Sequence, residues 1–204
     1  MKTRLPTRAI FLSVATALAL TGSSHADASV SIAVSFDALI HDSTAVTVAT
    51  ATESRAVWEN GRIVTYTHLH VDRAIAGALT TSDQPWVASL GGIIGTVGQV
   101  VDGEPTLRVG MPYLLFLRPD TTATAGTYIV TARAQGQFHL KAQSTAPGMT
   151  AVKVLHNPGV GEILPAKAAA NGSVPVAAAD QIEGRAIDAV AKDITSTWGK
   201  SHAQ

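Results

Sequence analysis

The sequence predicts a mainly β protein: a small barrel of five to seven strands, with a short helix before it and an amphipathic helix after it. Three observations support this prediction. Ala45 to Ala51 follows the two-residue repeat of a half-buried strand. Asn60-Gly61 is the strongest short hairpin signal, because both central residues of a type I′ turn need positive φ angles. Tyr113 to Leu117 is an unbroken apolar run, typical of a strand buried on both faces.

The first 28 residues have the layout of a secretory signal peptide. Basic residues near the start precede a mostly apolar run from Ala9 to Leu20, and small residues follow. This run is shorter than the roughly 20 residues of a membrane-spanning helix, and no later stretch is long and apolar enough to span. We therefore expect cleavage after Ala26 or Ala28 and an exported protein, extracellular or periplasmic, with no membrane span after cleavage.

The composition argues against several function classes. There is no cysteine, so no disulfide can form and a packed core must supply the stability. Cleavage after Ala26 removes three of the 15 basic residues and none of the 15 acidic ones, which changes the formal charge from zero to −3. The remaining Lys and Arg are scattered singly, so we expect no nucleic-acid partner and no charge-driven membrane binding.

The elements of the first half follow from local patterns. Ser35 is a suitable N-cap for a short helix ending at His41. After the strand from Ala45, Arg55 to Glu59 forms the outgoing arm of the hairpin. The return strand ends at Ala76-Gly77. Its alternation places Ile63, Thr65, Thr67, Leu69, Val71 and Arg73 on one face, and Val64, Tyr66, His68, His70 and Asp72 on the other.

The second half contains weaker signals. Trp86 to Leu90 is a further strand, and the glycines of Gly91 to Gly95 indicate bends. Segments Thr127 to Ala132 and Gln137 to Leu140 predict a hairpin around Gln135-Gly136. Residues 142–179 are expected to be rich in loops, with a last strand at Val152 to Leu155. A helix over 180–199 is expected, capped by Asp180, with this apolar stripe: Ile182, Ile187, Val190, Ile194 and Trp198.

The order of these strands, ending in Gly110-x-Pro-Tyr-Leu-Leu-Phe-Leu117, resembles the five-stranded OB-type barrel of the netrin-like or TIMP-like (tissue inhibitor of metalloproteinases) class. It also resembles secreted bacterial proteins with the same strand pattern. The resemblance implies an OB-like barrel over residues 29–141. Inhibitors of that class chelate a protease metal through an N-terminal cysteine, and this chain has none, so the resemblance implies a fold and no inhibitory mechanism.

His68 and His70 are the sharpest chemical candidates, because side chains at i and i+2 of a strand share a face. Asp72 extends that face, and both imidazoles could reach one zinc or copper ion. A third ligand would have to be His41, His139 or His156. The alternative is an exposed polar strand face, which we favour. We therefore expect no metal and no cofactor.

Other catalytic signatures are missing from the sequence. No Gly-x-Ser-x-Gly elbow frames a nucleophile, and Gly91-Gly92-x-x-Gly95 lacks the Lys-Ser/Thr of a phosphate loop. Trp58, Tyr66 and Trp86 could form an aromatic binding face, although core packing is the commoner use. We expect a non-enzymatic, exported barrel that binds a protein, peptide or glycan partner. The runner-up is a metal-binding or hydrolytic protein that uses His68 and His70.

Overall fold

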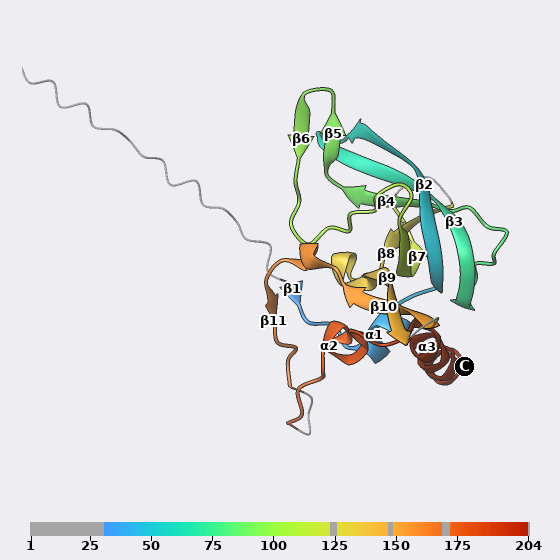
Figure 1. Ribbon diagram of the computed structural model, residues 1–204. Helices are drawn as coiled ribbons and strands as arrows, with labels where there is room; N and C mark the ends of the chain where they lie inside the picture. Colours follow the sequence, from blue (N-terminus) through green and yellow to red (C-terminus); the bar gives the residue numbers. More distant parts are fainter. Residues whose placement is uncertain (1–30, 123–125, 147–148, 169–171, 204) are drawn as a thin grey trace, which may run out of the picture.

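The computed structural model describes residues 31–122, 126–146, 149–168 and 172–203 (Figure 1). The predicted signal peptide, residues 1–28, lies outside the described residues. The chain is mainly β, with 47% strand and 20% helix, and it contains a closed five-stranded barrel, which confirms the predicted fold class. None of the helices in the described ranges is long and apolar enough to cross a membrane.

Eleven strands and three α-helices follow one another along these ranges. In chain order they are β1 Ser31–Ile32, α1 Phe36–His41, β2 Ala45–Glu59, β3 Arg62–Gly77, β4 Trp86–Leu90, β5 Gly92–Ile94, β6 Val97–Gln99, β7 Pro112–Pro119, β8 Thr127–Val130, β9 Gln137–Ala146, β10 Met149–His156, β11 Ile163–Leu164, α2 Ala178–Ile182 and α3 Ile187–Ser201. A 3₁₀ helix, Arg133–Gly136, joins β8 to β9.

The barrel is a sheet that closes on itself. Neighbouring strands follow the order β7-β2-β3-β4-β8, and β8 pairs again with β7 to complete the circle. All of these pairings are antiparallel except that of β4 with β8, which is parallel. Strands β9 and β10 extend the sheet from the other part of β7. Closure removes the exposed sheet edges that open sheets must protect.

The long hairpin of β2 and β3 provides the curvature. We expected two segments, Ala45 to Ala51 and Arg55 to Glu59, and the structure instead has one continuous strand. Its pairing with β3 shifts at three places, and such bulges bend and twist a strand as barrel closure requires. Asn60 and Gly61 have φ angles of 50° and 77°, as predicted for the turn.

The two faces predicted for β3 hold from Ile63 to Val71, but Arg73 is not buried. One shift in the pairing leaves Asp72 without an opposite residue, because Val71 pairs with Ala49 and Arg73 with Val48. A bulge of this kind moves the next side chain to the other face. Arg73 is therefore exposed, and its Nη1 donates to Oδ1 of Asp188 at 2.6 Å.

Strand β7 is buried on both faces, as the sequence predicts. Residues Tyr113 to Leu117 are all 0% exposed. Their side chains alternate between two cores. Tyr113, Leu115 and Leu117 pack inside the barrel with small β2 residues such as Ala49. Leu114 and Phe116 pack against the helices on the outside of the barrel. One strand therefore ties both cores together.

The helices form a layer on one side of the barrel, and the β5–β6 hairpin lies at the opposite end (Figure 1). In α1, Oγ of Ser35 accepts from the backbone N–H of Ala38 at 3.2 Å, which confirms the predicted cap. The single helix predicted over 180–199 is wrong. The chain breaks between α2 and α3, where Gly184 has a φ angle of 70°. Ala177, not Asp180, precedes the first turn, and α3 continues past Gly199.

Two further expectations about the second half are wrong. Segments 127–132 and 137–140 are not a hairpin, because β8 pairs with β4 and β7 whereas β9 pairs with β7 and β10. Strand β9 also continues beyond residue 141, to Ala146, and pairs with a β10 longer than the predicted Val152 to Leu155. Where the outer part of this hairpin is exposed, its side chains are mostly polar, so the sequence shows no apolar alternation there.

Truncation of Leu115 tests the interior of the barrel. Leu115→Ala is expected to lower the free energy of unfolding by about 2–5 kcal/mol, because it leaves a cavity in a closed core. Val152→Ala is the control, since Val152 is 37% exposed on β10 and its truncation should cost no more than about 0.5 kcal/mol. Urea denaturation followed by tryptophan fluorescence measures both. Equal midpoints for the two variants would contradict this account of the core.

Candidate ligand-binding groove

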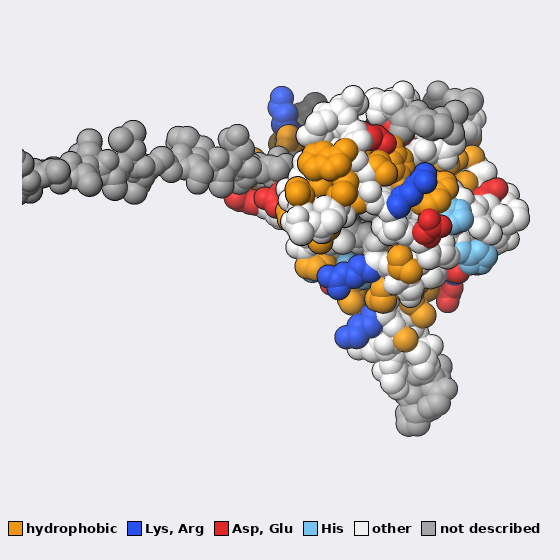
Figure 2. Space-filling model, turned by 90° about the horizontal axis from the view of Figure 1, so that it is seen from above, with side chains coloured by type: hydrophobic (Ala, Val, Ile, Leu, Met, Phe, Trp, Pro, Cys, Tyr) orange, Lys and Arg blue, Asp and Glu red, His pale blue; other side chains and the backbone are white. Residues whose placement is uncertain are grey.

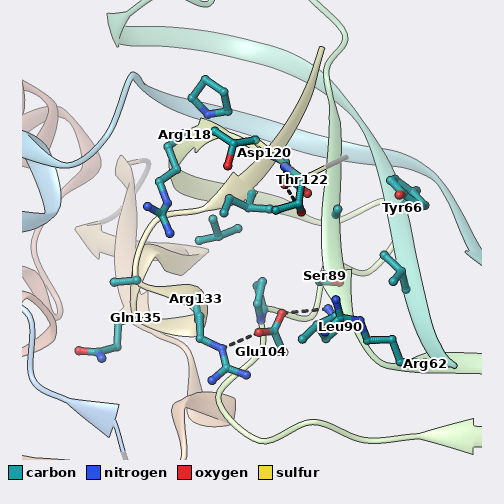
Figure 3. Close-up of a pocket in the computed structure, with 18 of the residues that line it drawn as sticks. Arg62, Tyr66, Ser89, Leu90, Glu104, Arg118, Asp120, Thr122, Arg133 and Gln135 are labelled. Carbon is teal, nitrogen blue, oxygen red and sulfur yellow. Dashed lines mark hydrogen bonds and ion pairs between the residues drawn. The ribbon is translucent and has the colours of Figure 1, made fainter. Parts of the chain in front are cut away.

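A groove of about 730 Å³ crosses the outside of the barrel over β3, β4 and β8 (Figure 3). One row of paired residues runs across it. Tyr66 lies opposite Ala88, Ala88 opposite Ile129, and Ile129 opposite Arg118. The β2–β3 turn borders the groove at Asn60, and the connection that follows β7 borders it from Asp120 on. The groove therefore depends on barrel closure, which brings these four strands into one row.

The floor of the groove is aliphatic. Val64 and Ala88 are each 7% exposed, and Leu90 and Ile129 are half-buried. Val64 and Leu90 form a directly opposed pair on β3 and β4. The backbone N–H of Leu90 donates to Oε2 of Glu104 at 2.9 Å. The floor thus offers apolar contact surface, and this polar backbone group is already satisfied.

Tyr66 forms one side of the groove and is held in place by a carboxylate. Its hydroxyl donates to Oε1 of Glu59 at 2.9 Å. Burial, followed by this hydrogen bond, raises the pKa of the Tyr66 phenol above its usual value, so the side chain is neutral at physiological pH. The guanidinium of Arg55 lies 5.9 Å from the Tyr66 ring and 4.8 Å from the Trp86 ring. These cation–π distances join Tyr66 to a second aromatic side chain outside the groove.

Another side of the groove is an ion pair between Glu104 and Arg133. Nε of Arg133 donates to Oε1 of Glu104 at 2.5 Å, and the Glu104 side chain is 12% exposed (Figure 3). Arg133 follows Ala132, and their φ angles are 57° and 54°. Two consecutive non-glycine residues in the left-handed region are strained, and such strain persists where the surroundings hold it. The pair ties the loop after β8 to the turn before β7.

Arg62 and Arg118 lie on opposite sides of the groove (Figure 3). Both are exposed, and neither side chain forms an ion pair or hydrogen bond within the part of the chain that the structure describes. Asp120, close to Arg118 in the chain, accepts from the backbone N–H of Thr122 at 2.8 Å and from its hydroxyl at 2.7 Å. The groove thus presents two cationic groups that are available for a ligand.

The structure brings together only part of the predicted aromatic face. Tyr66 lines the groove, and Trp86 stacks on His68 with ring centroids 4.6 Å apart. Arg55 connects these two groups, as described above. Trp58 is 55% exposed on β2 and belongs neither to the groove lining nor to a ring contact among the described residues.

The predicted histidine face exists, but its members have other contacts. His68 stacks on Trp86, and its Nδ1 lies 3.3 Å from the Thr52 hydroxyl. Nε2 of His70 lies 4.0 Å from Oδ1 of Asp72, whose other oxygen accepts from Thr50 at 2.6 Å. In the described ranges no three His, Cys, Asp or Glu residues gather as a metal site would require.

The three histidines considered as a third ligand lie in other surroundings. His41 Nδ1 is 2.9 Å from Asp42, and the His41 ring neighbours that of His202. His139 packs edge-on to Tyr113, and burial lowers its pKa, which favours the neutral imidazole. His156 Nδ1 lies 2.8 Å from Oε2 of Glu183.

Sequence reasoning missed the arginines and Glu104. Arg62 is the first residue after a hairpin turn, and Arg118 ends the buried strand, so each reads locally as a solvated end of a strand. Glu104 stands in a stretch with the composition of a turn, Asp102-Gly103-Glu104-Pro105, which gives no local sign of a role in binding. No local pattern joins positions that only barrel closure brings to one groove. The sequence predicts the strand ends at which Arg62 and Arg118 stand, but it does not predict that these two ends lie close together.

Glu104→Gln tests the wall of the groove. Glutamine keeps an acceptor but loses the charge that holds Arg133, so the free energy of unfolding should fall by about 1–3 kcal/mol. Asp188→Asn is the control, because the Arg73–Asp188 pair is 46% and 83% exposed and should contribute under about 1 kcal/mol. Chemical denaturation measures both. A larger loss for Asp188→Asn would show that Glu104 does not hold this wall.

Comparison with known proteins adds no relative. No model of a protein family, no curated protein and no solved structure matches the chain. A role for the groove must therefore be argued from the residues that line it and from the barrel that carries it.

Proposed function

We propose that the protein is an exported, non-enzymatic binding module that takes a protein, peptide or glycan partner in the groove over β3, β4 and β8. The observation that carries this proposal is the position of the groove. It combines an aliphatic floor with two available arginines, on the face framed by the β2–β3 turn and the segment after β7. Export rests on the predicted signal peptide alone.

The strand order supports an OB-type assignment. Numbered along the chain within the barrel, β2, β3, β4, β7 and β8 are strands one to five, and they follow one another around the barrel as 1-2-3-5-4. OB-type barrels bind ligands on the face of strands two and three, between the 1–2 and 4–5 loops. The groove of this chain lies on that face. This argument by fold supports binding as such and does not select a ligand.

The groove chemistry favours binding over catalysis. No histidine stands among the described residues that line the groove, so its serines and threonines lack the usual general base. Its three carboxylates, Glu59, Glu104 and Asp120, are all engaged in hydrogen bonds within the protein. Groups held in this way shape a surface, whereas a catalytic acid or base must reach a substrate atom.

A groove-filling variant tests the proposal. Ile129→Trp places a neutral, bulky side chain on the groove floor, and Ala88→Leu does so from the neighbouring strand. Val152→Trp, on exposed β10, is the matched control. The purified protein is screened on an array of random peptides and on a glycan array.

Specific binding to at least one class of probe is expected for the parent and for Val152→Trp, and at least tenfold weaker binding for the two floor variants. Thermal midpoints close to that of the parent show that each variant has folded. If Ile129→Trp and Ala88→Leu both bind the probes as tightly as the parent, the binding site lies elsewhere and the groove proposal is wrong.

The runner-up function rests on one observation, that His68 and His70 lie on the same outer face of β3 with Asp72 nearby. Because His68 is stacked on Trp86 and no third ligand joins it within the described ranges, we expect a His68→Gln, His70→Gln double variant to fold and to keep partner binding. Metal analysis of the purified protein should give substoichiometric zinc and copper. One tightly held ion per chain, lost in the double variant, would make metal binding the leading function.

A further inference from the structure

We propose that the natural ligand of the groove is an acidic peptide segment, with an aliphatic side chain on the floor and carboxylates at Arg62 and Arg118. This inference rests on the proposed function, because it takes the groove as the binding site and specifies what occupies it. Three properties of the groove support it: two arginines without a partner among the described residues, the geometry of arginine, and the apolar character of its floor.

The charge argument depends on which groups are already paired. Six charged residues line the groove, in the order Glu59, Arg62, Glu104, Arg118, Asp120 and Arg133. Glu59 accepts from Tyr66, Glu104 accepts from Arg133 and from Leu90, and Asp120 accepts from Thr122. The formal charge of the lining is therefore balanced, but its carboxylates are engaged while two guanidinium groups are not. The carboxylates keep their charge but have partners within the protein, so the two guanidinium groups are the charged groups whose donors remain for a ligand.

The guanidinium group favours a carboxylate. Its planar fork offers two parallel N–H donors, which match the two oxygens of a carboxylate, and such charged hydrogen bonds are about twice as strong as neutral ones. Arg62 and Arg118 lie on opposite sides of the groove, so they would meet two acidic groups at separate positions of the ligand (Figure 3). A chain with acidic residues on either side of the floor has this arrangement.

The floor favours a peptide over an acidic sugar. Val64, Ala88 and Ile129 have no polar side-chain atoms, and the N–H of Leu90 is taken by Glu104. A sugar hydroxyl buried there would lack a partner, which costs free energy, whereas the aliphatic side chain of a peptide gains from the same burial. Tyr66 provides an aromatic ring at the side, but its hydroxyl already donates to Glu59.

The rest of the surface formed by the described residues offers no stronger candidate. Exposed hydrophobic residues occur on and near the β5–β6 hairpin, where Ile93 is 73% and Val100 is 91% exposed. Figure 2 shows hydrophobic side chains among separate charged ones on the face seen from above. Nothing in the structure indicates what would cover that hairpin. The groove, in contrast, has both a shape and a charge to which a partner can be complementary.

The test is a selection from a displayed library of random ten-residue peptides. The parent protein is the bait, and Ile129→Trp is used for counter-selection so that only groove-dependent binders remain. We expect these binders to be enriched in Asp and Glu around a Val, Leu or Ile. The affinity of a representative binder for the parent should fall as salt is raised, since exposed charge pairs are screened.

The arginines are tested with the same binder. Arg62→Gln together with Arg118→Gln should weaken it at least tenfold, and Arg108→Gln, an exposed arginine outside the groove lining, should leave its affinity unchanged. Each single variant should give part of the effect. Thermal midpoints close to that of the parent establish that the variants fold.

The outcomes separate this inference from the proposed function. Groove-dependent binders that lack acidic residues, or that are insensitive to the arginine double variant, would overturn the acidic ligand and leave the groove as a binding site. If counter-selection leaves no binder, because every selected peptide binds Ile129→Trp as well as the parent, both the acidic ligand and the groove are overturned. A soluble oligogalacturonate that binds the groove more tightly than any selected peptide would replace the peptide with an acidic glycan and refute the peptide assignment.

Discussion

The structure depends on the burial of β7 on both of its faces. Tyr113, Leu115 and Leu117 fill the barrel, while Leu114 and Phe116 anchor the helix layer. Along one edge the strand pairs with β2. Along the other it pairs first with β9 and then, from Leu117 on, with β8. A chain without cysteine has no disulfide between its layers, so the apolar contacts of this strand are a main link between barrel and helices, beside contacts such as the Arg73–Asp188 hydrogen bond.

The groove forms where β7 changes its pairing partner from β9 to β8. Strand β8 is short and lies between β7 and β4. It pairs with β4 only from Trp86 to Ala88, so the last residues of β4 have no β8 partner. Glu104 fills that place by accepting from the backbone N–H of Leu90. Its second oxygen holds Arg133, whose backbone and that of Ala132 adopt the left-handed region. The wall of the groove is therefore held by the hydrogen bonds of Glu104, which form where the pairing between β4 and β8 ends.

Preorganisation of this kind matters for binding. Ordering side chains on association costs free energy, and groups that are already held do not incur that cost again. Tyr66, Glu104 and Asp120 are held by contacts within the protein. Arg62 and Arg118 are the exception among the charged lining residues, and long cations at the rim of an apolar floor suit recognition by charge complementarity. This division between held walls and unpaired arginines is the reason for proposing an anionic partner.

The sequence by itself determined the elements whose patterns are local. The Ser35 cap, the Asn60-Gly61 turn and the apolar run of β7 were predictable because each depends on neighbouring residues in the chain. The join of β2 into one strand, the break at Gly184 and the separation of β8 from β9 were not. They depend on bulges and on pairings between distant strands, which single-chain periodicity does not encode. The alternation along β3 predicted that Tyr66 lies on the outer face of that strand, and the structure places it there, in the groove lining. Arg62 and Arg118 line one groove only in the tertiary structure, because barrel closure brings a hairpin turn and the end of β7 together.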